Sequence, residues 1–155
     1  MKPRMIDFYM RIAEETAKLS RARRLQVGCV IVKDDNIISF GWNGTPAGWD
    51  NDCEYREYCP NHETNYEYPF EDVNGRYRLV TKSEVIHAEA NAILKLTRSH
   101  NSSKNSSMFL THAPCIECAK LISNSGIHNI FYREVYRNKD GINFLIQSKT
   151  NVSQI

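Results

Sequence analysis

The sequence predicts a three-layer α/β/α sandwich around a mixed β-sheet. Two observations carry this prediction. Segments that read as helical or extended follow one another in the order helix, two strands, helix, strand, helix, strand, helix. Alternating strands and helices are typical of sheets covered by helices on both faces. The length of 155 residues suits one domain, which we expect to span residues 1–155.

The first half of the chain supplies a helix and a hairpin. Apolar residues recur with helical spacing over residues 5–19. Residues 27–32 are a wholly apolar run typical of a buried strand, and a turn at residues 34–36 leads into a second strand at 37–40. The loop at residues 41–48 is rich in Gly, Pro and Asn and should be ordered.

Residues 49–80 are polar and aromatic and show no periodicity. We expect this stretch to be a partly ordered insertion or lid without regular structure. Long segments of this kind are more often functional than idle.

The second half alternates helices with strands and is followed by a polar C-terminal tail that should be loose. The expected elements are a helix at 84–96, a strand at 108–111, a helix at 114–124 stopped by Gly126, a strand at 129–132 and a helix at 141–147.

Charge and composition exclude several classes of protein. The net charge is +2, with 20 basic and 18 acidic residues, so no chain-wide nucleic-acid footprint is present. The N-terminus has no apolar signal core and no stretch is long enough to span a bilayer, so we expect a cytoplasmic protein. In a reducing compartment its five cysteines should be thiols or metal ligands.

Three residues are candidate zinc ligands. Cys115 and Cys118 are three apart at the start of a predicted helix, where they share one face and the helix terminus favours thiolates. His87 would supply a third ligand, which leaves zinc the open position of a catalytic site. Taken alone, the cysteine pair is also compatible with a redox pair or half of a structural zinc site.

Glu89 completes the pattern. It lies two residues after His87 and can face the same site without binding metal, as a general base toward water and then a general acid. His87-Ala-Glu89 followed by Pro114-Cys115-Ile-Glu-Cys118 matches the signature of zinc deaminases, H-x-E with P-C-x-x-C. A structural zinc module would have no use for Glu89.

The chain resembles the deoxycytidylate (dCMP) deaminase family of the cytidine deaminase-like superfamily over roughly residues 5–147. The resemblance rests on both zinc motifs, on Val27-Gly-Cys29, on Gly41-Trp-Asn-Gly-Thr-Pro-Ala-Gly48 and on Ser125-Gly-Ile127. It implies a five-stranded central sheet and zinc-dependent hydrolysis of dCMP to dUMP, which supplies thymidylate synthesis. It also implies that His87, Cys115 and Cys118 hold zinc while Glu89 moves protons.

The resemblance assigns further contacts around the substrate. Asn43 would contact the sugar or base, the carbonyl of Ala113 would meet the departing amino group, and Tyr136 would lie near the substrate. Asn43 is equally suited to a turn, and Tyr136 to packing. Arg21 and Arg24 are candidates for the 5′-phosphate because guanidinium groups suit phosphate oxygens, although most surface arginines are only solvated.

Regulation is also implied by the resemblance: a homohexamer activated by dCTP and inhibited by dTTP. Gly44 and Thr45 are candidate effector contacts because they adjoin Asn43 in a glycine-rich loop. Cys53, Cys59 and His62 form a separate cluster that would hold a second, structural zinc, as in some family members, but the local sequence lacks a convincing fourth ligand.

Two other enzymes remain as alternatives. A deaminase of bases in nucleic acid, similar to tRNA adenosine deaminases, would need a basic surface that the balanced charge disfavours. A free-nucleoside cytidine deaminase commonly has Cys in place of His87. The expected partners are therefore small nucleotides, with neither nucleic acid nor membrane.

Overall fold

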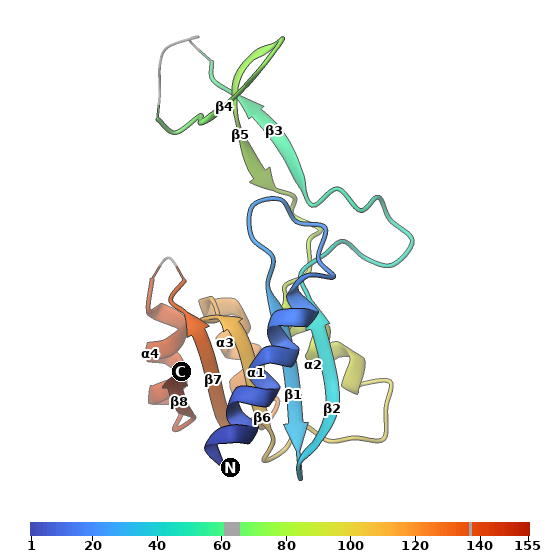
Figure 1. The fold of residues 1–155 in the computed structure, drawn as a ribbon, viewed down its shortest axis with the longest axis vertical. Coiled ribbons are helices and arrows are strands. Elements are labelled where there is room, and N and C mark those ends of the chain that lie inside the picture. Colours follow the sequence, from blue (N-terminus) through green and yellow to red (C-terminus); the bar gives the residue numbers. More distant parts are fainter. Residues whose placement is uncertain (61–65, 137) are drawn as a thin grey trace.

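The computed structural model describes residues 1–60, 66–136 and 138–155. Figure 1 shows a body of helices and strands from which a narrow β-arm projects. None of the helices in the described ranges has the length and apolar character needed to cross a membrane. In chain order the elements are α1 (Pro3–Ala17), β1 (Gly28–Lys33), β2 (Asn36–Trp42), β3 (Glu54–Tyr58), β4 (Phe70–Asp72), β5 (Gly75–Thr81), α2 (Ala88–Leu96), β6 (Ser107–His112), α3 (Ile116–Asn124), β7 (Asn129–Glu134), α4 (Asp140–Gln147) and β8 (Asn151–Gln154).

The central sheet has five strands in the order β2-β1-β6-β7-β8. β1 pairs antiparallel with β2 and with β6, whereas β6–β7 and β7–β8 are parallel. The predicted α/β fold with a five-stranded mixed sheet is therefore confirmed.

Helices cover both faces of this sheet, and alternate residues of β1 show how. Val30 and Val32 pack with Tyr9 and Met10 of α1 on one face. Cys29 and other residues on the opposite face pack in a second core with apolar side chains of α2, α3 and α4. β1 is buried on both faces, which explains its wholly apolar sequence.

Both helices of the candidate site begin later than the sequence suggested. α2 starts at Ala88 rather than at residue 84 because Ile86 forms an isolated antiparallel bridge with Gly44. α3 starts at Ile116, two residues after Pro114. His87 and Cys115 therefore occupy the extended residue immediately before each helix.

The expectation of a loose C-terminal tail was wrong. Residues Asn151–Gln154 form β8, which pairs in parallel with β7 at the edge of the sheet. Asn151 N–H donates to the His128 carbonyl, and Ile155 N–H donates to the Tyr132 carbonyl. Main-chain pairing at a sheet edge needs few apolar side chains, so the polar sequence did not reveal it.

The expectation that residues 49–80 lack regular structure was also wrong. β3, β5 and β4 form a separate antiparallel sheet, in that order, which we call the arm. Three of its aromatic rings contact one another: the ring centroids of Tyr58 and Tyr77 lie 5.7 Å apart, and those of Phe70 and Tyr77 5.5 Å. Aromatic residues favour strands, and Asn74-Gly75 suits the tight turn between β4 and β5.

Candidate active site

The N-termini of α2 and α3 bring the candidate zinc ligands together. His87 and Cys115 precede these helices, and Cys118 lies in the first turn of α3. The Nδ1 atom of His87 is 3.6 Å from the Cys115 sulfur and 3.4 Å from the Cys118 sulfur. Within the described residues these three form the one group of three or more potential metal ligands, with ligand atoms all within 4.8 Å of one another.

This donor set fits zinc. Tetrahedral zinc with Zn–S bonds of ~2.3 Å and Zn–N bonds of ~2.05 Å places sulfur and nitrogen ligands about 3.5 Å apart. Both nitrogen–sulfur distances agree with that value. Two cysteines and one histidine are also the ligands that zinc prefers, and three protein ligands leave one position open.

The two cysteines and His87 shift one another's pKa. Hydrogen bonds from Cys118 and His87 lower the pKa of Cys115 to about 3. The same contact with Cys115, together with burial, raises the pKa of Cys118, and the bond to Cys115 raises the pKa of His87. A low thiol pKa is what a metal-binding thiolate requires.

Glu89 lies beside the ligand cluster without belonging to it. It is the second residue of α2 and is only 4% exposed. Burial is the main cause that raises the pKa of its carboxyl group. A buried carboxyl that can both hold and release a proton suits general acid–base chemistry.

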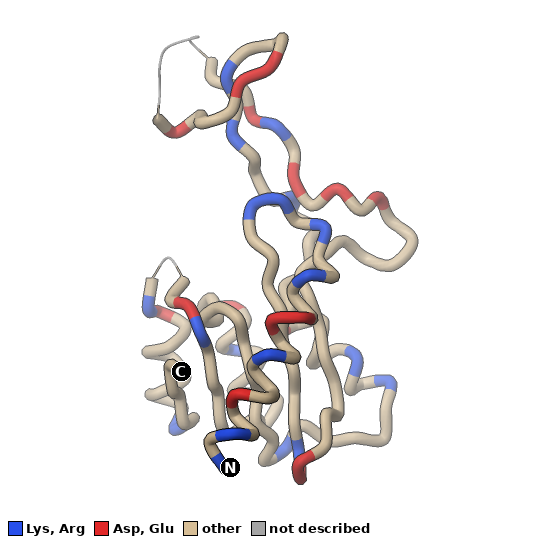
Figure 2. Tube along the Cα trace, in the orientation of Figure 1, with Lys and Arg blue, Asp and Glu red and all other residues tan. Residues whose placement is uncertain are grey.

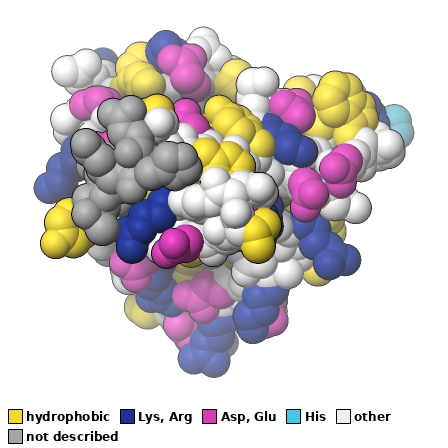
Figure 3. Space-filling model, turned by 90° about the horizontal axis from the view of Figure 1, so that it is seen from above, with side chains coloured by type: hydrophobic (Ala, Val, Ile, Leu, Met, Phe, Trp, Pro, Cys, Tyr) yellow, Lys and Arg dark blue, Asp and Glu magenta, His cyan; other side chains and the backbone are white. Residues whose placement is uncertain are grey.

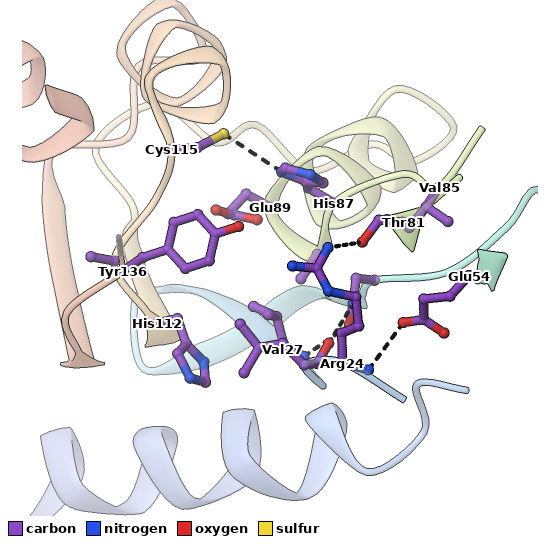
Figure 4. A pocket seen from close by; sticks show the side chains of 14 residues that line it. Arg24, Val27, Glu54, Thr81, Val85, His87, Glu89, His112, Cys115 and Tyr136 are labelled. Atoms are coloured by element: carbon purple, nitrogen blue, oxygen red, sulfur yellow. Dashed lines mark hydrogen bonds between the residues drawn. The ribbon is translucent and has the colours of Figure 1, made fainter. Parts of the chain in front are cut away.

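A cavity of about 260 Å³ opens onto these residues. Figure 4 shows Glu89, His87 and Cys115 on one side of it, with Tyr136 pointing toward Glu89 and Arg24 facing them from the loop between α1 and β1. The lining residues are Arg24, Leu25, Val27, Asn43, Glu54, Thr81, Val85, His87, Ala88, Glu89, His112, Ala113, Cys115 and Tyr136.

Asn43, Ala113 and Tyr136, which the resemblance placed around the substrate, all line this cavity. The Asn43 amide already holds the neighbouring loop, because its Oδ1 accepts from Val27 N–H and its Nδ2 donates to the Leu25 carbonyl, each at 2.8 Å. One lone pair and one N–H remain for a ligand. The Ala113 N–H donates to the Glu134 carbonyl at 2.8 Å, which fixes this peptide at the cavity wall.

The two candidate phosphate arginines separate. Arg24 lines the cavity, whereas Arg21 is exposed and does not. The sequence analysis missed Glu54, Thr81 and His112, which also line the cavity. Glu54 and Thr81 belong to the arm, where no motif marked them, and His112 lies at the end of β6.

The candidate effector residues lie outside the cavity lining. The Gly44 N–H donates to the Ile86 carbonyl at 3.1 Å, and Ile86 N–H donates back at 2.9 Å. The Thr45 backbone hydrogen-bonds to the Cys53 thiol. The Gly44 amide is therefore already engaged within the chain.

The candidate second zinc cluster is not assembled by the described residues. Cys53 directly precedes β3 and Cys59 directly follows it. Six residue steps of extended chain span roughly 20 Å, too far for both thiols to bind one ion within the chain. His62 lies outside the described residues.

Comparison with known proteins agrees with this site. The family model of the cytidine and deoxycytidylate deaminase zinc-binding region matches residues 3–134. The chain belongs to this family. The sequence-based identification as a family member and the prediction of a zinc-dependent deaminase are thereby confirmed, and the cluster of His87, Cys115 and Cys118 fits the family's zinc.

Individual family members are similar over most of the chain. The deoxycytidylate deaminase of Enterobacteria phage T4 is 36% identical over 154 residues, covering 85% of this chain and 79% of that protein. The human deoxycytidylate deaminase is 32% identical, covering 86% and 67%. The crystal structure of dCMP deaminase from the cyanophage S-TIM5, in complex with dCMP and dUMP, has a TM-score of 0.82 at 35% identity and covers 100% of this chain and 99% of that one.

Proposed function

We propose that this protein hydrolyses dCMP to dUMP and ammonia, supplying dUMP for thymidylate synthesis. One observation carries the proposal: two residues of the zinc-ligand cluster, His87 and Cys115, line one cavity together with Glu89 and Arg24. The similar S-TIM5 enzyme is described in complex with dCMP and dUMP, which supports the same substrate here.

The catalytic residues follow from the cavity. Zinc held by His87, Cys115 and Cys118 would supply Lewis-acid chemistry that makes water nucleophilic near neutral pH. Glu89 accepts a proton as water attacks C4 of cytosine and delivers it to ring nitrogen N3. Glu89 then passes the second proton of the water to the amino group, which leaves as ammonia while the C4 carbonyl forms.

Substrate contacts come from three sides of the cavity. The Ala113 carbonyl accepts from the amino group at C4, the remaining hydrogen-bonding capacity of Asn43 serves the sugar or base, and Tyr136 packs beside the ring. Arg24 binds the 5′-phosphate through its guanidinium. We assign no phosphate contact to Arg21, which lies outside the cavity lining.

The test is an ammonia-release assay across dCMP, CMP, deoxycytidine, dCTP and a cytosine-containing oligonucleotide. We expect dCMP to give the highest kcat/KM. Preference for the oligonucleotide would favour the alternative, a deaminase of bases in nucleic acid. Acidic and basic residues alternate along the chain (Figure 2), and their side chains are interspersed over the arm-side face (Figure 3). A polyanion-binding surface would instead gather basic side chains.

We further propose regulation by dCTP and dTTP in a homohexamer, acting in the cytoplasm. The loop at Gly44 and Thr45 supports the regulatory part, because its bridge to Ile86 adjoins both Asn43 and His87. Saturation curves for dCMP with each triphosphate, together with light scattering, test it. A hyperbolic curve that neither triphosphate changes, from a monomer, would remove regulation while leaving the deaminase proposal intact.

A further inference from the structure

Glu54 is a buried carboxylate outside the catalytic cluster. It is the first residue of β3, and its side chain is 1% exposed. Both of its oxygens accept from the Arg23 N–H at 3.1 Å, and one also accepts from the Arg24 N–H at 3.1 Å. Hydrogen bonds to an ionised carboxylate are roughly twice as strong as bonds between neutral groups. Glu54 therefore fixes the backbone of the arginine loop against the base of the arm.

Thr81 contacts the guanidinium end of Arg24. It is the last residue of β5 and pairs directly with Glu54 across the arm. Its Oγ1 accepts from the Arg24 Nη1 at 3.0 Å. Figure 4 shows both contacts beside the cavity. Arg24 is thus held at its backbone by Glu54 and at its guanidinium by Thr81.

The partner of the Arg24 guanidinium is neutral, and this matters for binding an anion. Within residues 1–60, 66–136 and 138–155, Arg24 makes no ion pair, whereas Arg23 lies 3.8 Å from the Glu54 carboxylate. A guanidinium has five N–H donors, of which Thr81 occupies one. Arg24 is therefore oriented while its charge and most of its donors stay available to a phosphate.

We propose that Glu54 and Thr81 are positioning residues that orient Arg24 toward the substrate phosphate, so that the base of the arm sets the selectivity for nucleotide over nucleoside. The proposal rests on the proposed function, because Arg24 is taken to meet the 5′-phosphate of dCMP. It assigns the arm a role in the enzyme's own substrate recognition.

The test uses Thr81→Val, which keeps the shape of the side chain and removes the acceptor. We expect KM for dCMP to rise about 3- to 10-fold, as for loss of one ordinary hydrogen bond, with less than a twofold change in kcat. The kcat/KM for deoxycytidine, which lacks the phosphate, should change less than twofold. Thr81→Ser should restore the dCMP value, and Ser83→Ala, an exposed hydroxyl nearby, serves as the matched control.

A double-mutant cycle separates positioning from a structural role. If Thr81 acts through Arg24, Thr81→Val has no further effect on dCMP binding in an Arg24→Ala background. Additive effects, or an equal loss for deoxycytidine, would overturn the proposal. Calorimetric binding of dCMP in the Glu89→Gln background gives the same comparison without turnover. The binding comparison tests the positioning role of Thr81 even if the deaminase assay shows no turnover, so the two proposals can fail separately.

Discussion

Gly41 of β2 lies directly against Ala88 of α2. A Cβ atom added to Gly41 would come within 2.4 Å of the Ala88 carbonyl oxygen and 2.6 Å of the Ala92 amide nitrogen. Backbone atoms in a close-packed interior cannot absorb such an overlap without moving. Glu89 lies in α2, and His87 directly precedes this helix. The close contact between β2 and α2 therefore fixes how near both residues lie to the sheet.

Gly41→Ala should destabilise the protein by about 1–3 kcal/mol, as overpacking of a core does. Denaturant unfolding followed by circular dichroism measures this change. Gly44→Ala is the matched control, since a Cβ atom there would meet only Trp42 side-chain atoms, at 3.8 Å. It should change the free energy of unfolding by less than ~0.5 kcal/mol. Equal effects of the two substitutions would contradict the close approach of β2 and α2.

Glu89→Gln should lower kcat for dCMP by about 10²–10⁴-fold, the usual contribution of a general acid–base group. Zinc content by atomic absorption should be unchanged, because Glu89 is outside the ligand cluster. Glu15→Gln, on the exposed side of α1, controls for the loss of a carboxylate. Turnover of Glu89→Gln within a few-fold of the unsubstituted enzyme would assign proton transfer to another residue.

Cys115→Ala should abolish both zinc binding and deamination, because two protein ligands remain where three are needed. Cys29→Ala removes a buried thiol from the core and should keep one zinc per chain. A chelator should inactivate the enzyme, and added zinc should restore it. Full activity in the absence of metal would rule out the zinc mechanism.

Arg24→Ala should raise KM for dCMP by about 10- to 100-fold, the loss expected when charge-assisted hydrogen bonds to a phosphate disappear. Arg21→Ala removes an equal charge from outside the cavity lining and should change KM less than twofold. Steady-state kinetics at fixed ionic strength compares the two. A larger effect at Arg21 would move the phosphate site away from the described cavity.

The sequence predicted those parts of the molecule that are determined by residues close together in the chain. The apolar run of β1 shows burial on both faces, and the spacing of Cys115 and Cys118 follows from one helical turn. It did not predict β8 or the arm, because these strands are held by main-chain pairing and by contacts among tyrosines rather than by an alternating apolar pattern.

Single residues of the cavity lining were likewise not predictable from the sequence. Glu54 and Thr81 gain their roles only when β3 and β5 pair and place them beside Arg24. Nothing in their neighbours along the chain marks them. Arg21 and Arg24 looked alike in the sequence, and only the course of the loop placed Arg24 in the cavity lining.

The two hydrogen bonds between Gly44 and Ile86 have a consequence for how the chain tolerates change. They join the point where the chain leaves the body to the point where it returns, so the whole arm is a loop closed at its neck. The entropy of closing such a loop grows only slowly with its length. The Gly44–Ile86 bridge thus separates His87 from insertions and deletions in the arm. The arm can change in length while the zinc ligands keep their positions.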